Sequence, residues 1–317
     1  MTGDEVQIVT VVGAGTMGPG IAVTFVRNGF DVRLTDVKPE VLEKAKSTVD
    51  QVYKTLVNDG FISEADAASG RARLTFTDNQ EEALRGADFV IEAIPEKLEI
   101  KQAFFRDVEK KVREDTILAS NTSGILITRL GEVVQRPGRV VGMHWSNPPH
   151  LIPVIEVIKG ALTDDATVEA TTRVVERIQM LPVLVRRDVP GFVQNRILYA
   201  IMREALHLLE EGVASAKDID AIAKWGIGYK LSVIGPLELL DVAGLDIYQS
   251  VASYLNADLC AADKVSPLIA EKVQRGELGI KTGRGLFEYK ADEIPALVQR
   301  RMRLLLSAKK ALAGTSR

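Results

Sequence analysis

The 317-residue sequence has few of the residues that make disulfides and zinc sites, with one cysteine, Cys260, and three histidines. One cysteine cannot form a disulfide within the chain, and no spacing of cysteine and histidine is typical of zinc binding. The sequence therefore predicts no metal site. A reducing, cytosolic compartment, the cytoplasm, fits this cysteine usage best.

The sequence also has no excess of positive charge, since 40 Lys and Arg stand against 43 Asp and Glu. Proteins that bind nucleic acids need cations for the phosphates, so we expect no nucleic-acid partner. The one long run without charge, residues 6–26, contains four glycines and a proline and follows two acidic residues. This composition favours a buried strand and helix over a membrane span or signal peptide.

Length and periodicity predict two domains that differ in secondary-structure content. Residues 1–187 alternate short apolar strands with helices, which is typical of an α/β domain with a doubly wound sheet. After Asp188 the periodicity is helical, so residues 188–317 are expected to form an all-helical domain, with the boundary near residues 186–191. The basic residues 300–317 could be a frayed helix end and are interpreted as a solvated tail.

The expected strands cover residues 6–12, 31–35, 73–76, 88–93, 116–119, 139–144, 154–158 and 182–185. The expected helices of the first domain cover residues 21–28, 39–57, 99–112 and 164–179. Those of the second domain cover residues 193–211, 216–225, 236–255 and 267–275.

A glycine-rich run follows the first expected strand. Gly13, Gly15 and Gly18 have the G-x-G-x-x-G spacing, with Thr16 and Met17 between the last two. Between a strand and a helix, this run allows a tight turn, close approach of a pyrophosphate and helix packing. The alternative is an ordinary strand-to-helix turn. Asp36, at the end of the second strand, can accept hydrogen bonds from a ribose, which favours NAD over NADP.

Three histidines compete for a proton-transfer role. His207 lies in an apolar helix, where a core or interface role is expected, and His150 could line a cleft between proline-containing segments. His144 ends a strand, where open α/β sheets bind ligands. Glu156 lies inside an apolar strand and could orient His144, because a buried carboxylate needs a partner. The alternative is an edge strand with Glu156 facing water.

Five segments carry a specific resemblance: residues 120–123 (SNTS), 142–149 (GMHWSNPP), 154–157 (VIEV), 190–196 (PGFVQNR) and 281–285 (KTGRG). In this order they resemble the L-3-hydroxyacyl-CoA dehydrogenase family. The resemblance implies a Rossmann domain followed by a helical domain that forms a homodimer. It also implies an NAD-dependent enzyme with a small-molecule substrate, and a place in fatty acid metabolism.

The resemblance also assigns roles to individual residues. His144 and Glu156 match the catalytic pair, Ser123 matches the serine that touches the substrate hydroxyl, and Asn195 matches the asparagine that polarises the carbonyl. Positions near the nicotinamide half of the cofactor are matched by Glu96, Lys101, Ser123, Asn147 and Lys281. Read locally, Ser123 could instead form a turn, Asn195 could face water, and Glu96 and Lys101 could be ordinary charges at a helix start.

The sequence departs from acyl-CoA members of the family at a few positions. Ser146 stands where they usually have an aromatic residue, and Ile152 and Pro153 replace an apolar residue and a lysine. Counted without gaps from Asp36, Val52 and Asp59 fall where they have a serine and a lysine that contact the CoA nucleotide; a shift of the alignment within this helix would bring Lys54 there instead. The Asn-Pro-Pro motif is similar to that of relatives that act on free hydroxy acids, such as gulonate or carnitine dehydrogenases.

The function expected from the sequence is hydride transfer between NAD(H) and a 3-hydroxy or 3-keto acyl compound, a 3-hydroxyacyl-CoA in the first place. The same scaffold acting on a free hydroxy acid, a C=N bond or another carbonyl without CoA is an alternative. A catalytically silent NAD-binding structural protein is a more remote one.

Overall fold

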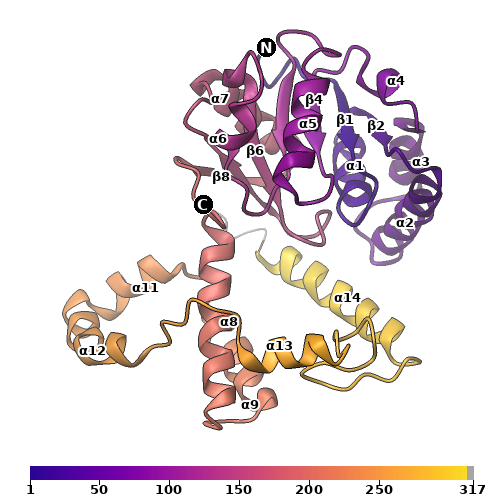
Figure 1. The fold of residues 1–317 in the computed structure, drawn as a ribbon. Helices are drawn as coiled ribbons and strands as arrows, with labels where there is room; N and C mark the ends of the chain where they lie inside the picture. The colour runs from indigo at the N-terminus through magenta and orange to yellow at the C-terminus, as the bar shows by residue number, and fades with distance from the viewer. Residues whose placement is uncertain (313–317) are drawn as a thin grey trace. The chain divides into compact units, whose positions relative to one another are not determined.

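The computed structural model describes residues 1–312 and divides the chain into two compact units, Met1–Asn195 and a second that begins at Arg196. The first unit contains one eight-stranded sheet (Figure 1). Its strands are β1 (Ile8–Val12), β2 (Asp31–Thr35), β3 (Leu74–Thr77), β4 (Phe89–Glu92), β5 (Ile117–Ser120), β6 (Val140–Trp145), β7 (Val154–Ile158) and β8 (Leu181–Val185).

The strand order is β3-β2-β1-β4-β5-β6-β7-β8, and every neighbouring pair is parallel except β6 with β7. The order of the first six strands is that of a doubly wound dinucleotide-binding sheet. The predicted fold class is confirmed. The chain reverses its direction of travel across the sheet between β1 and β4, which is where such sheets bind ligands.

Helices accompany the strands of the first unit (Figure 1). They are α1 (Gly18–Arg27), α2 (Pro39–Asn58), α3 (Glu64–Ala72), α4 (Gln80–Leu84), α5 (Leu98–Val108), α6 (Ile127–Gly131), the short 3₁₀ helix Pro137–Arg139 and α7 (Asp165–Arg177). The helix α1 packs against α2 and α3, and α5 packs against α6. One core cluster joins Phe105 of α5 to Leu118 of β5 and Val140 of β6, all buried.

The uncharged run of residues 6–26 forms β1 and α1. Both elements are buried, which explains the absence of charge without a lipid environment. No helix within residues 1–312 is long and apolar enough to cross a membrane.

Three short helices, α3, α4 and α6, were not expected from the sequence. The helix α3 has no apolar residue larger than alanine, so its apolar periodicity is weak. Its start is nevertheless marked by a capping box, in which Ser63 Oγ accepts from the Asp66 amide and the Asp66 carboxylate accepts from the Ser63 amide. This Ser-x-x-Asp pattern is a sequence signal that could have located it.

The second unit is helical, as expected. Its elements are α8 (Gln194–Glu210), which begins two residues before the unit, α9 (Ala216–Ala221), a π-helical stretch (Ile222–Gly228), α10 (Tyr229–Leu231), α11 (Pro236–Ala243), α12 (Leu245–Asp258), α13 (Pro267–Gln274) and α14 (Ile294–Leu312). The single helix expected over residues 236–255 is wrong. Gly244, with φ +99°, separates α11 from α12, because a helix cannot continue through that backbone conformation.

The basic residues 300–312 belong to the helix α14, so a helix end is present there, and most of these residues are exposed. Leu306 is the buried residue of this helix. Residues 313–317 lie outside the described part.

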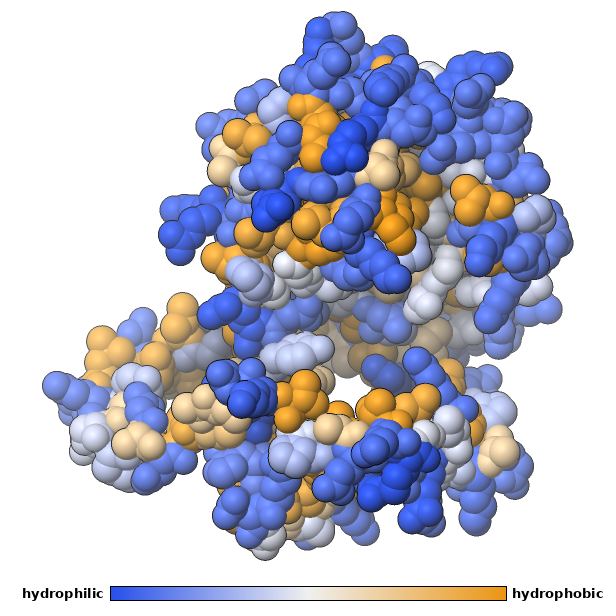
Figure 2. All heavy atoms as spheres, viewed as in Figure 1, coloured by the Kyte–Doolittle hydropathy of each residue, from blue (hydrophilic) through white to orange (hydrophobic). Residues whose placement is uncertain are grey.

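The helices α8 to α13 contain no buried residue in the described structure. Figure 2 shows apolar residues on the surface of the molecule, and many of them belong to this unit. On α8 alone the exposed apolar side chains are Ile197, Leu198, Tyr199, Ile201 and Met202. The second unit therefore has far more exposed apolar surface than a self-contained domain.

Candidate functional site

The predicted site residues of the first unit gather at one edge of the sheet. The carboxyl ends of parallel strands lie at the same edge, and the residues that follow β1, β2, β4 and β5 or end β6 are placed there. They are Gly13, Gly15, Thr16, Met17, Gly18, Asp36, Glu96, Ser123, His144 and Asn147. This edge, at the reversal between β1 and β4, is the candidate site.

The glycine turn has a shape that other residues would not allow. Gly13 has φ +107°, and a Cβ there would lie 2.4 Å from the Ala93 carbonyl oxygen. A Cβ on Gly18 would lie 2.0 Å from the Gly13 carbonyl oxygen. Gly15 is exposed, with no atom within 4 Å of its Cβ position, so a ligand can approach the backbone closely.

The turn also presents a helix N-terminus. The helix α1 begins at Gly18 without a side-chain cap and without an acidic residue in its first turn. Its positive dipole end is therefore available to an anion such as a pyrophosphate. Thr16 is exposed beside it, and Met17 is half-buried. These features fit the phosphates of a dinucleotide.

Asp36 is held against the same turn. Its Oδ2 accepts a hydrogen bond from the Ala14 amide at 2.9 Å, and its Oδ1 accepts from the Lys38 amide at 3.1 Å. The Gly13 amide donates to the Thr35 carbonyl oxygen at 2.8 Å. A fixed carboxylate at the end of β2 can accept hydrogen bonds from ribose hydroxyls and would repel a phosphate.

His144 and Glu156 face each other across the antiparallel pair β6 and β7. His144 Nδ1 lies 2.7 Å from Glu156 Oε2, and both side chains are buried, 5% and 3% exposed. The strand β7 lies between β6 and β8, so the alternative of an edge strand with Glu156 facing water is wrong. A carboxylate only accepts, so Nδ1 carries the proton and Nε2 is the free acceptor.

The second oxygen of Glu156 is also satisfied. Oε1 accepts from the backbone amides of Val193 and Gln194 at 2.9 and 3.0 Å. Burial alone would raise the pKa of Glu156, but the hydrogen bonds from His144 and these two amides outweigh it and lower the pKa. Glu156 is therefore a stable anion that fixes the orientation of the imidazole.

Two further hydrogen-bonded pairs join neighbouring segments near these residues. Asn195 Nδ2 donates to the Ser123 carbonyl oxygen at 3.0 Å, which brings together two residues far apart in the sequence. The Ser146 hydroxyl lies 2.6 and 2.8 Å from the two amide atoms of the Gln194 side chain. Ser146 is two residues after His144, and the Gln194 backbone amide donates to Glu156, so this polar pair is connected to the His144–Glu156 pair through the chain and through Glu156.

A buried polar cluster lies behind the site, and its central residue, Glu92, was not singled out in the sequence. Glu92 ends β4 and is fully buried, with Lys101 Nζ 2.5 Å from its Oε1. Lys101 Nζ is also 3.2 Å from Glu96 Oε2. Burial raises the pKa of Glu92, against the opposing effect of the Lys101 ammonium. A carboxylate inside an apolar strand was the signal that could have revealed it.

Glu96 is linked to the segment after β5. Its Oε1 accepts from Thr122 Oγ1 at 2.5 Å and from the Ser123 amide at 2.8 Å. Partial burial would raise the pKa of Glu96, but the hydrogen bond from Thr122 and the charge of Lys101 prevail and lower it.

The remaining candidates are placed as follows. Asn147 is exposed just after β6 and precedes Pro148 through a cis peptide bond. His150 is buried and lies against the start of α1, since a Cβ on Gly20 would be 3.1 Å from its Nδ1. Lys281 is exposed in a turn of the second unit, and His207 lies on α8.

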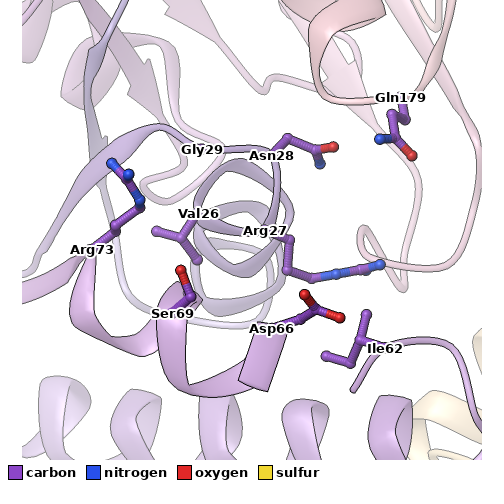
Figure 3. A pocket seen from close by; sticks show the side chains of 10 residues that line it. Val26, Arg27, Asn28, Gly29, Ile62, Asp66, Ser69, Arg73 and Gln179 are labelled. Atoms are coloured by element: carbon purple, nitrogen blue, oxygen red, sulfur yellow. The ribbon is translucent and has the colours of Figure 1, made fainter. Parts of the chain in front are cut away.

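A pocket of about 330 Å³ is found at the other end of α1 (Figure 3). Its lining includes Arg27, Asp66 and Arg73 and none of the predicted site residues. Within residues 1–312, no group of three or more histidine, cysteine or acidic residues could hold a metal ion.

Comparison with known proteins gives two kinds of relative. The chain is 46% identical to 5-formyl-3-hydroxy-2-methylpyridine 4-carboxylate 5-dehydrogenase of Mesorhizobium japonicum, over 98% of this chain and 99% of the relative. It is 40% identical to a probable 3-hydroxybutyryl-CoA dehydrogenase of Deinococcus radiodurans, over 88% of this chain and 99% of the relative.

Solved structures give the same two kinds. A 5-formyl-3-hydroxy-2-methylpyridine 4-carboxylic acid 5-dehydrogenase, described as an NAD⁺-dependent dismutase, matches with a TM-score of 0.92 and 45% identity, over 98% of this chain and 100% of that one. The (S)-3-hydroxybutyryl-CoA dehydrogenase of Ralstonia eutropha matches with a TM-score of 0.75 and 36% identity, over 90% and 100%.

Two family models cover most of the chain. The NAD-binding domain of 3-hydroxyacyl-CoA dehydrogenase matches residues 8–189, and the C-terminal domain of the same enzyme matches residues 191–289. Together with the relatives, these matches show an NAD-dependent dehydrogenase scaffold along the chain. The chain belongs to the 3-hydroxyacyl-CoA dehydrogenase family and is an NAD-dependent oxidoreductase.

Proposed function

We propose that His144 and Glu156 form the acid–base pair of this dehydrogenase, and that the enzyme works in the cytoplasm on a small carbonyl compound without CoA. The observation that supports the catalytic role is the 2.7 Å contact between His144 Nδ1 and Glu156 Oε2, since it leaves Nε2 as the proton acceptor. NAD, when bound, supplies the acceptor for the hydride.

In the oxidation, His144 Nε2 accepts the hydroxyl proton of the substrate while the hydride leaves the same carbon. Glu156 then stabilises the imidazolium that forms. In the reduction, the imidazolium returns the proton to the carbonyl oxygen. Ser123 and Asn195 are proposed to hold the reacting oxygen from the other side, while Glu96, Lys101, Asn147 and Lys281 serve the nicotinamide half of the cofactor.

Two observations support a substrate without CoA. Val52, at a position where acyl-CoA members have a serine for the CoA nucleotide, is buried in α2 and only 7% exposed. Ser146, two residues after His144 at the position where acyl-CoA members usually have an aromatic residue, is hydrogen-bonded to Gln194. A hydroxyl and an amide suit a carboxylate or hydroxyl on the substrate better than an acyl chain.

The relative from Mesorhizobium japonicum suggests the substrate class, an aromatic aldehyde that carries a carboxylate. Water adds to such an aldehyde and gives a geminal diol, which has a hydroxyl and a hydrogen on one carbon. Removal of the hydroxyl proton by His144 and of the hydride then yields the carboxylic acid. A 3-hydroxyacyl-CoA remains the second candidate, because the family models and the relative from Deinococcus radiodurans favour it.

We also propose that the second unit forms a homodimer. Its helices α8 to α13 bury no residue in the described structure, and α8 exposes a row of apolar side chains. Covering apolar surface is worth roughly 25 cal/mol per Å², so a second copy of this chain would stabilise the unit substantially.

Asp36 is expected to set the cofactor preference. NADPH should bind at least ~1–2 kcal/mol more weakly than NADH, because its 2′-phosphate would meet the Asp36 carboxylate. Fluorescence titration of both cofactors measures this difference, and Asp36→Ala should reduce it. Glu40→Gln, an exposed change in the first turn of α2, is the control and should leave it intact. Equal dissociation constants in the wild type would contradict the assignment.

His144→Gln is expected to lower kcat by ~10²–10⁴-fold while NADH binding persists, because the proton acceptor is lost and the cofactor turn is intact. Glu156→Gln should also lower kcat, and the double variant should be no worse than His144→Gln alone, since the two residues act as one unit. Steady-state kinetics and NADH titration measure these effects. Additive losses would show a separate role for Glu156.

The substrate prediction concerns kcat/KM. The aldehyde 5-formyl-3-hydroxy-2-methylpyridine 4-carboxylate with NAD⁺ should give a kcat/KM at least ~10-fold above that of acetoacetyl-CoA with NADH, because the polar pair favours a polar substrate. Ser146→Phe should reduce this ratio, and His144→Gln should abolish both activities. A higher kcat/KM for the thioester would favour the second candidate function.

The dimer prediction is a mass of twice 34.6 kDa in light scattering at micromolar concentration. Ile201→Asp, on the exposed apolar face of α8, should shift the mass towards one chain, because a charge would be buried in the interface. Glu211→Gln, an exposed change just after α8, should not. A wild-type mass of one chain would contradict the proposal.

A further inference from the structure

We infer that Glu92 is a positioning residue for the nicotinamide half of the cofactor site, acting through Lys101 and Ser120 on Glu96 and residues 120–123. This inference rests on the part of the proposed function that assigns Glu96 and Ser123 to the cofactor. It is independent of which substrate the enzyme uses.

The Glu92 carboxylate accepts hydrogen bonds from three donors. Its Oε1 accepts from Lys101 Nζ at 2.5 Å and from the Ile94 amide at 2.8 Å. Its Oε2 accepts from Ser120 Oγ at 2.5 Å. Glu92 and Ser120 are 0% exposed and Lys101 is 1% exposed, so neither substrate nor cofactor touches Glu92.

The cluster continues towards the surface in two directions. Lys101 Nζ reaches the half-exposed carboxylate of Glu96 at 3.2 Å. Ser120 Oγ accepts from the Thr122 amide at 3.2 Å, and Thr122 Oγ1 donates to Glu96 at 2.5 Å. Glu92 thus fixes both the helix that carries Lys101 and the segment after β5, and Glu96 joins the two.

The position of the cluster relative to the glycine turn identifies which half of the cofactor it serves. Ala93, next to Glu92, has its carbonyl oxygen 2.4 Å from the position that a Cβ on Gly13 would occupy. The strand β4 lies on one side of β1, and β2 with Asp36 lies on the other. If Asp36 holds the adenosine ribose, the cluster borders the opposite half.

Stability alone does not account for this arrangement. A buried ion pair often contributes no more to stability than apolar side chains of the same volume. Here the buried partner of Lys101 ties together three segments at the site edge, so orientation of Glu96 and Ser123 is the property that depends on it.

The test measures binding of the whole cofactor and of its adenosine half separately. In Glu92→Gln, the NADH dissociation constant should rise at least ~5-fold and kcat should fall ~10–100-fold, because small displacements at a reacting centre are costly. The dissociation constant of ADP, which probes the adenosine half alone, should stay within ~2-fold, since the glycine turn and Asp36 are unchanged. A merely structural loss would weaken ADP and NADH alike.

Ser120→Ala removes one donor to the same carboxylate without leaving a charge unpaired, so it tests the inference if Glu92→Gln does not fold. It should also raise the NADH dissociation constant and leave that of ADP unchanged, with a smaller effect than Glu92→Gln. Glu99→Gln, an exposed change on α5, is the matched control and should alter neither constant.

Equal weakening of ADP and NADH in either variant would overturn the inference, and so would unchanged NADH binding and kcat in the variants that fold. NADH and ADP binding are measured without substrate, so an error in the proposed substrate class cannot change the two dissociation constants.

Discussion

The antiparallel pairing of β6 with β7 is the interaction on which the candidate site depends. All other neighbouring strands are parallel, and only this reversal places His144 directly opposite Glu156 in the strand register. A slip of one residue would turn one of the two side chains to the other face of the sheet. The backbone amides of Val193 and Gln194 then bind the second carboxylate oxygen and hold the start of α8 against the sheet.

The site combines two carboxylates held in different ways. Glu156 accepts from an imidazole and two amides, which outweigh its burial and lower its pKa, and it holds His144 in one orientation. Glu92 accepts from a buried ammonium and lies where burial raises its pKa. In the roles that we propose, both residues act through a neighbour and neither contacts the reacting atoms.

The two units differ in how completely each buries its own apolar side chains. The first has a closed core around β5 and β6, in which Phe105 and Leu118 are almost completely buried. The second exposes apolar side chains along its helices, for example Trp225 at 66%. Contact of so much apolar surface with water is unfavourable, and for this reason we propose that copies of the chain associate through it.

The sequence by itself determined the α/β class, the bounds of strands such as residues 31–35 and 154–158, and the glycine turn with Asp36, because periodicity and turn chemistry are local. The helix break at Gly244 was missed, since the positive φ of that glycine is a property of the folded backbone and not of the apolar periodicity around it. Tertiary structure decided that Glu156 is paired and that Glu92 binds Lys101. Such contacts join residues 9 to 28 positions apart through strand order, which no local pattern contains.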